Sequence, residues 1–141
     1  MYSFKILEND NKNLKILGFE LDIKGNISKD LWPQLTKKIQ KNIQNFSARN
    51  LSFKGKILIA KSLLVSKIWY TAYLLPPSRK QLNTINTLIS NWTKNNSHLL
   101  PRYSIFQLNL EHGGLSAPIL RDILDTRLTS IWLKLLSSDL F

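Results

Sequence analysis

Residues 52–77 read SFKGKILIAKSLLVSKIWYTAYLLPP, and this stretch decides how the rest of the chain must fold. From Ser52 to Leu75 apolar residues fall on almost every side of a helix: Ile57, Leu58, Ile59, Leu63, Leu64 and Ile68. Because a helix that is apolar all round is a buried one, we predict that this segment is the central helix of the protein. Pro76 and Pro77 end it, since proline has no backbone N–H to continue the helix.

A second helix is expected directly upstream, from Lys29 to Arg49. Its apolar residues recur every three or four positions, the spacing of one helix face: Leu31, Leu35, Ile39, Ile43 and Phe46. Ser28 stands where an N-cap side chain would accept a backbone N–H. Pro33 is tolerated because it falls near the first turn. The segment therefore predicts an amphipathic helix that packs on the central one.

The N-terminal residues alternate between apolar and polar instead. Tyr2, Phe4 and Ile6 alternate with polar neighbours, and the same period of two returns from Phe19 to Ile23. A turn-rich polar segment, Glu8 to Asn13, separates the two runs. This pattern is typical of a β-hairpin.

Downstream of the prolines, the sequence again predicts helices. One runs from Ser78 to Asn91, a short one from Ser104 to Leu110, and a last one begins near Pro118. The apolar residues of the first and last of these helices are Leu82, Ile85, Leu88 or Ile89, and Trp92, then Ile119, Ile123, Leu128, Ile131, Trp132 and Leu135. Gly113 and Gly114 break the chain before the last helix.

The predicted fold class is therefore α+β and predominantly α, with a short N-terminal β-hairpin followed by a bundle of about four main helices. Three segments follow from this organisation. Residues 1–26 form the hairpin, residues 27–110 form a basic helical region, and residues 111–141 form the Gly-Gly turn and a C-terminal helix that packs on that region.

The charge of the chain is concentrated in its middle. The formal net charge is +11, and residues 24–80 hold twelve Lys and Arg against one acid, while both flanks are nearly neutral. Such a stretch indicates a surface for polyanions, either nucleic acid or anionic lipid. A merely solvated basic face remains the alternative.

Eight cations of this stretch are the candidate nucleic-acid-binding residues: Lys37, Lys38, Lys41, Arg49, Lys54, Lys56, Lys61 and Lys67. The spacing of Lys54 and Lys61, and of Lys56 and Lys67, predicts that each pair lies along one helical line. Two basic ridges on neighbouring helices would contact phosphates and position a duplex without reading its bases.

No pattern in the sequence points to catalysis, a metal or a cofactor. Two-metal nucleotide chemistry needs converging carboxylates, and the chain has no adjacent acidic pair. Asp122 and Asp125 share a helix face with arginines beside them, which favours a salt-bridged surface. His98 and His112 lack the spacing of a metal site, so we expect both on the surface. We predict no enzyme activity, no cofactor and no small-molecule substrate.

Other classes of partner and compartment follow from composition. The absence of cysteine and of a secretory signal favours the nucleus or the cytoplasm. Lys61 and Lys67 interrupt the most apolar window, Ile57 to Leu75, so we predict no transmembrane segment. We expect the four tryptophans to lie mainly in the core, with Trp69, between Lys67 and Tyr70, as the one candidate for stacking on a base.

Four short segments, taken in order, resemble one known family. They are Leu17–Phe19, Phe46–Lys56, Ile89–Trp92 and Gly113–Leu115. Together they resemble the region that follows the catalytic palm in reverse transcriptases of non-LTR, LINE-type retrotransposons, and the similarity spans roughly residues 14–136. Phe46 departs from the tryptophan common in that family.

The resemblance implies a role as well as a fold. Residues 1–26 would be a remnant of the palm edge, and the helices would be the thumb that grips the template-primer duplex, with the cations of Arg49 to Lys56 against its backbone. The palm carboxylates and the fingers are missing from this chain, so the resemblance implies a non-catalytic fragment of an RNA-directed DNA polymerase. Two alternatives stay open: a degenerate transposon remnant without present activity, and a basic protein of membrane surfaces.

Overall fold

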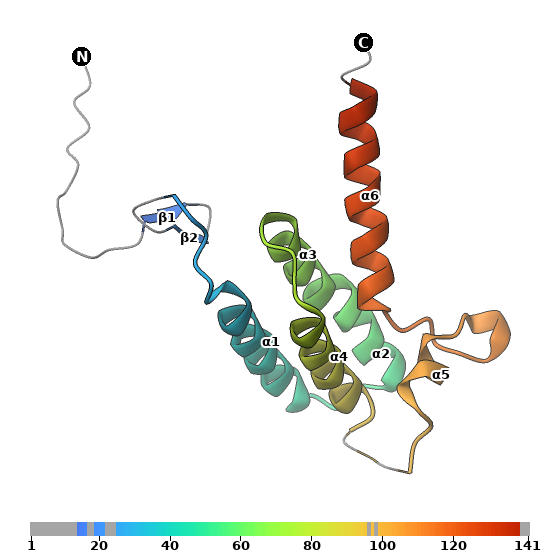
Figure 1. Ribbon diagram of the computed structural model, residues 1–141. Coiled ribbons are helices and arrows are strands. Elements are labelled where there is room, and N and C mark those ends of the chain that lie inside the picture. The colour runs from blue at the N-terminus through green and yellow to red at the C-terminus, as the bar shows by residue number, and fades with distance from the viewer. Residues whose placement is uncertain (1–13, 17–18, 22–24, 96, 98, 139–141) are drawn as a thin grey trace, which may run out of the picture. The chain divides into compact units, whose positions relative to one another are not determined.

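The computed structural model describes residues 14–16, 19–21, 25–95, 97 and 99–138 (Figure 1). The chain divides into two compact units, Met1–Leu31 and Trp32–Phe141. The C-terminal segment that the sequence sets apart, residues 111–141, falls within the second unit in this division.

The first unit contains two short strands, β1 (Leu14–Ile16) and β2 (Phe19–Leu21), which pair antiparallel. Leu14 lies opposite Leu21, and an isolated bridge joins Leu21 to Ile27. β2 falls within the second predicted strand. The first predicted strand, around Tyr2 to Leu7, lies outside the described residues, so the hairpin that the sequence pattern indicates remains a prediction.

Helices make up the rest of the described chain, and the prediction of a predominantly helical protein is confirmed. In order they are α1 (Leu31–Ser47), α2 (Phe53–Ile59), η1 (Ala60–Leu64), α3 (Val65–Leu74), α4 (Arg79–Thr93), α5 (Tyr103–Gln107), η2 (Leu110–His112) and α6 (Leu120–Ser138). The observed bounds of the long helices fall within a few residues of the predicted ones.

The core lies where α1 and α4 pack along the central run formed by α2, η1 and α3 (Figure 1). Its fully buried side chains come from all three: Trp32, Ile39, Leu64, Ile68, Ile85 and Ile89. At one end the Trp32 indole Nε1 donates to the carbonyl of Leu75 at 3.0 Å. At the other, the rings of Phe46 and Trp92 lie 6.3 Å apart. The central position predicted for residues 52–75 is therefore correct, but burial on all sides is not, because Leu58 and Leu63 are 66% and 45% exposed.

The central run is not the uniform α-helix that the sequence predicts, because η1 is a π-helical segment. A π turn closes i→i+5 hydrogen bonds and so holds more residues than an α turn. Side chains before and after η1 are rotated relative to the positions that an unbroken α-helix would give them. No sequence signal marks this turn, since a segment that is apolar on nearly all sides has no single stripe whose shift would reveal the extra residue.

Serine caps fix where two of the helices begin. The Ser52 hydroxyl accepts the backbone N–H of Gly55 at 3.2 Å at the start of α2. Ser78 and Gln81 form a reciprocal capping box at the start of α4, with hydrogen bonds of 3.3 Å and 2.8 Å. Each cap satisfies N–H groups that have no partner within the helix.

The segment between α5 and α6 folds back on itself. Gly113 adopts a left-handed conformation with φ of 78°, and the N–H of Ser116 donates to Leu108 at 2.9 Å. The N–H of Ala117 then donates to Phe106 at 2.8 Å, directly before α6 begins.

The two halves of α6 differ in burial. Leu120 and Leu124 of its first half are buried in the core. The second half extends beyond the other helices of this unit (Figure 1) and exposes four large apolar side chains: Trp132, Leu133, Leu135 and Leu136. The expectation that the tryptophans lie mainly in the core does not hold for Trp132, because no described helix reaches this part of α6 to cover it.

Candidate nucleic-acid interface

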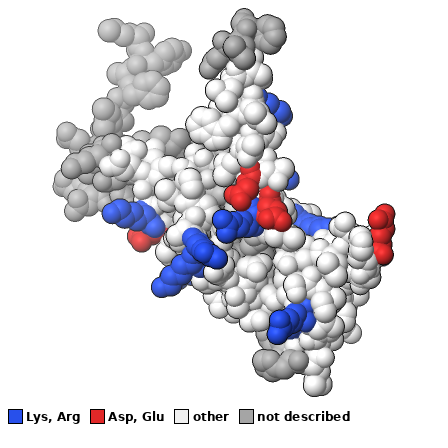
Figure 2. Space-filling model, turned by 45° about the vertical axis from the view of Figure 1, so that its right-hand side comes forward, with Lys and Arg blue, Asp and Glu red and all other residues white. Residues whose placement is uncertain are grey.

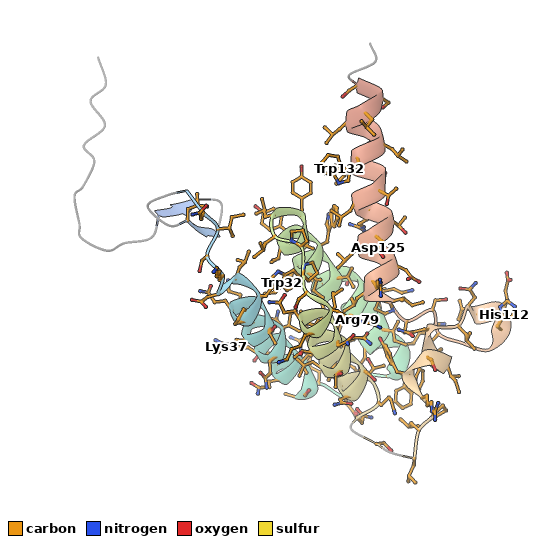
Figure 3. The ribbon with its side chains drawn as sticks, viewed as in Figure 1. Trp32, Lys37, Arg79, His112, Asp125 and Trp132 are labelled. Atoms are coloured by element: carbon orange, nitrogen blue, oxygen red, sulfur yellow. The ribbon has the colours of Figure 1, made fainter. Side chains whose placement is uncertain are left out.

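Three of the predicted cations share one face of α1. Lys37, Lys38 and Lys41 are all exposed, whereas Leu35 and Ile39 of the same helix are buried. The spacing of three and four residues places these lysines together on the solvent side. Figure 3 shows Lys37 directed away from the neighbouring helices.

Two further cations lie where α1 leads into α2. Arg49 follows the end of α1 and is exposed, with its guanidinium 5.8 Å from the centre of the Phe46 ring. Lys54 is exposed in the first turn of α2, directly after the Ser52 cap. The Ser52 cap fixes the backbone at the start of α2, and the Phe46 ring contacts the Arg49 side chain. Both charges therefore lie at the connection between α1 and α2.

Lys61 and Lys67 lie farther along the central run, on η1 and α3, and both are exposed. Lys61 borders a shallow pocket that it shares with Asp122 and Arg127 of α6. The neighbourhood of Lys61 therefore includes one carboxylate and one further cation.

Lys56 is the one predicted binding residue that the structure places in the interior, with 5% of its surface exposed. Its ammonium Nζ donates to the carbonyl of Trp92 at 3.0 Å and to the side-chain oxygen of Asn95, and lies 5.7 Å from the Trp92 ring. Burial lowers the pKa of this lysine below its usual 10.5.

The assignment of Lys56 to the phosphate-binding surface is thus corrected. A buried ammonium needs hydrogen-bond partners, and Lys56 finds them at the C-terminal end of α4, where helix carbonyls lack partners within the helix. Lys56, Ala60, Leu64 and Ile68 follow one another at intervals of four, and the last three are core residues, so Lys56 shares the buried side of the central run.

Of the two lysine pairs expected to lie along one helical line each, Lys56 and Lys67 do not form an exposed pair, because Lys56 is buried. Lys54 and Lys61 are both exposed, and the π-helical segment begins between them. The surface instead carries seven separate exposed cations, on α1, on the connection after it and on the central run.

The tryptophans also differ from expectation. The indole of Trp69 is partly buried and packs against Tyr73, with ring centres 6.0 Å apart, and the Arg127 guanidinium lies 5.5 Å from its ring centre. Arg127 therefore covers the ring of Trp69, which we predicted from the sequence as the candidate for stacking on a base. Trp132 is the exposed indole among the described residues, with 64% of its surface accessible (Figure 3).

Arg79, Lys80 and Arg121 are exposed cations that the sequence did not single out. The first two open α4 after the Ser78 cap, and Arg121 lies in the first turn of α6. Their exposure could have been expected from the sequence, because all three lie at the starts of predicted helices. Figure 2 shows Lys and Arg in separate places over one face, some with acidic side chains beside them, rather than as one continuous patch.

The acidic and histidine side chains show no catalytic arrangement within the described residues. The Arg121 Nε lies 3.7 Å from the Asp125 carboxylate, and both side chains are 69% exposed, as a surface pair should be. No cluster of three or more His, Asp or Glu that could hold a metal ion occurs in the part of the chain that the structure describes. His112 is exposed as expected, and His98 lies outside that part.

One helical run is long and apolar enough to cross a membrane by length and composition alone. It is Phe53–Leu74, with a mean hydropathy of 1.3, and 39% of its most apolar window is buried inside the protein. The central helix of a protein core passes the same test. Because the buried side of this run forms the middle of the core, its apolar character has a structural reason.

The candidate interface thus consists of seven exposed cations carried by three parts of one helical unit: Lys37, Lys38, Lys41, Arg49, Lys54, Lys61 and Lys67. The unit that carries them is rigid in its interior, because buried side chains of α1, α4 and the central run pack together. No protein-family model, curated protein or solved structure matches this chain.

Proposed function

We propose that this protein binds the phosphate backbone of a nucleic-acid duplex without reading its bases, as the thumb region of a retrotransposon reverse transcriptase would. The observation that carries the proposal is the exposure of seven of the eight predicted cations. The ion pair found among the described residues joins Arg121 to Asp125, so within that part of the chain none of the seven has its charge neutralised by an ion pair.

The physical basis is counterion release. Each lysine or arginine that meets a phosphate displaces condensed cations from the duplex, which makes affinity fall steeply with salt. Contacts of this kind fix position and orientation and carry no sequence information. The cations lie on α1, at Arg49 and on the central run, so a phosphate backbone of the nucleic acid that contacts them would pass over several helices.

The finer parts of the proposal rest on the resemblance. The N-terminal hairpin is proposed to be the edge of a palm whose carboxylates come from other residues, so that this chain holds the duplex and catalyses nothing. It needs no cofactor for that role, and the nucleus or cytoplasm is where it meets nucleic acid.

The test compares two triple variants of equal charge. One triple variant combines Lys37→Gln, Lys38→Gln and Lys41→Gln. It should reduce the steepness with which log affinity falls against log salt by about three, one for each phosphate that no longer has a cation beside it. The control changes Lys29, Arg102 and Lys134, which are exposed cations outside the proposed interface, to glutamine. Fluorescence anisotropy with a labelled duplex measures both. If the salt dependence of affinity weakens equally in both variants, binding depends on net charge alone and the proposed interface is wrong.

A second candidate function, binding to an anionic membrane surface, is favoured by one observation. The end of α6 exposes Trp132, Leu133, Leu135 and Leu136, a set of side chains suited to the boundary between water and lipid. Vesicles of mixed anionic and neutral lipid would shift the fluorescence of Trp132 to shorter wavelength. Retention of that shift in the presence of excess duplex would favour the membrane over nucleic acid.

A further inference from the structure

A cleft lies between the start of α4 and the first half of α6. Its volume is about 370 Å³, and α4 and α6 contact each other beside it. The prolines that separate α3 from α4, Pro76 and Pro77, close one end. Figure 3 labels one residue from each wall, Arg79 on α4 and Asp125 on α6.

The cleft has an apolar floor. Leu124 of α6 is buried, and Leu82 of α4 and Leu128 of α6 are half-buried where they line it. These side chains belong to or border the core, so the floor is held in place by the packing of two helices. A flat apolar group could lie on it and lose contact with water.

The rim of the cleft is polar and carries two cations and one acid. Arg79 and Asn83 lie on the α4 side, and Arg121 and Asp125 on the α6 side. Arg121 is paired with Asp125 at 3.7 Å, but both are 69% exposed, and an exposed pair of this kind is worth little. The Arg121 guanidinium can therefore accept a stronger anion as a second partner.

A second depression adjoins the rim along the outer face of α4. It shares Arg79 and Asn83 with the cleft and adds Lys80, Thr84 and Thr87. A polymer that enters the cleft at Arg79 can thus continue along α4 over a surface that carries a further cation and Leu88.

We propose that this cleft holds one nucleotide of a single strand that continues from the bound duplex. The phosphate lies between Arg79 and Arg121, and the base lies on Leu82 and Leu128. This inference rests on the proposed function, because it assigns a second contact to the same nucleic acid.

The chemistry of the lining supports this ligand over a free phosphate. Guanidinium groups bind phosphate with paired hydrogen bonds, and apolar side chains accept the face of any base without regard to sequence. The volume lies within the usual range of small-ligand sites, about 300 to 1,000 Å³. Inorganic phosphate would leave the apolar floor uncovered.

The experiment compares a blunt duplex with the same duplex carrying a short single-stranded extension. The unaltered protein should bind the extended duplex several-fold more tightly. Arg79→Gln with Arg121→Gln should abolish that advantage and leave blunt-duplex affinity close to its original value. The matched control, Arg102→Gln with Lys134→Gln, removes the same charge from exposed positions outside the cleft and should keep the advantage.

A second variant tests the floor instead of the rim. Leu128→Glu places a carboxylate where the base should lie, and it should remove the preference for the extended duplex while circular dichroism shows unchanged helicity. Millimolar inorganic phosphate should leave the preference intact. Its loss under phosphate would reduce the cleft to a simple anion site and overturn the proposal.

The outcomes separate this inference from the proposed function. Failure of the cleft alone would show as equal affinity of the protein for blunt and extended duplexes, with normal salt dependence and normal sensitivity to the α1 lysines. Failure of the duplex-binding function would show as weak, salt-insensitive binding to both. Persistence of the extension preference in the Arg79 and Arg121 variant would overturn the cleft assignment directly.

Discussion

At the scale of single residues, two lysines of the same helix turn have opposite roles. Lys56→Met removes a buried ammonium that donates hydrogen bonds to the Trp92 carbonyl and to the Asn95 side chain, so we expect a decrease of about 1–3 kcal/mol in the free energy of unfolding. Lys54→Met removes the same charge from an exposed position and should stay within about 0.5 kcal/mol. Urea denaturation measures both. A Lys56 variant as stable as the Lys54 variant would show that the buried ammonium is dispensable.

Tyr103 gives a pH-dependent prediction at the same scale. Burial raises the pKa of its phenol from 10.0 to about 12, so the folded protein keeps a proton that the unfolded chain releases. The stability from this group is complete below pH 10 and is lost as the pH rises from 10 towards 12. The unfolding free energy of Tyr103→Phe, compared with that of the unaltered protein, should therefore fall less steeply across this range. Parallel pH profiles of the two proteins would contradict the assignment.

At the scale of elements, the turn between η2 and α6 depends on its two glycines in different degrees. A Cβ added at Gly114 would collide with the backbone carbonyl of Leu108, whereas one at Gly113 would meet open space and suffer only from the positive φ of 78°. Gly113→Ala should cost about 1 kcal/mol. Gly114→Ala should cost more, because the segment that pairs with Leu108 must shift. Thermal unfolding of the two variants gives the order, and equal midpoints would refute the collision.

Also at the scale of elements, helix bounds could be predicted from the sequence, whereas contacts between helices could not. Helix bounds were predictable because caps and prolines are local signals, as Ser78, Pro76 and Pro77 illustrate. The π turn and the burial of Lys56 were not predicted, since each depends on which side of the central run meets α1, α4 and α6. Exposure of Trp132 was missed for a related reason: an apolar stripe shows which side of α6 can be covered, but not whether another helix reaches it.

At the scale of the whole molecule, the core and the charge both belong to the second unit. The buried core cluster runs from Trp32 to Leu124, and residues 1–26 hold four lysines and four acids, so their removal leaves the net charge at +11. The chain 27–141 keeps Ser28, whose hydroxyl accepts the N–H of Asp30 just before α1. We therefore expect this shortened chain to fold with an unfolding midpoint close to that of the full chain.

Its binding follows from the same division. All seven exposed cations of the proposed interface remain, so the affinity for duplex and its dependence on salt should match those of the full chain. Circular dichroism checks the fold, and anisotropy titrations at several salt concentrations check the binding. If the shortened chain folds but binds with a shallower salt slope, residues 1–26 contribute phosphate contacts of their own, and the interface extends beyond the helices. If it does not fold, residues 1–26 stabilise the helical unit, and the two units are energetically coupled.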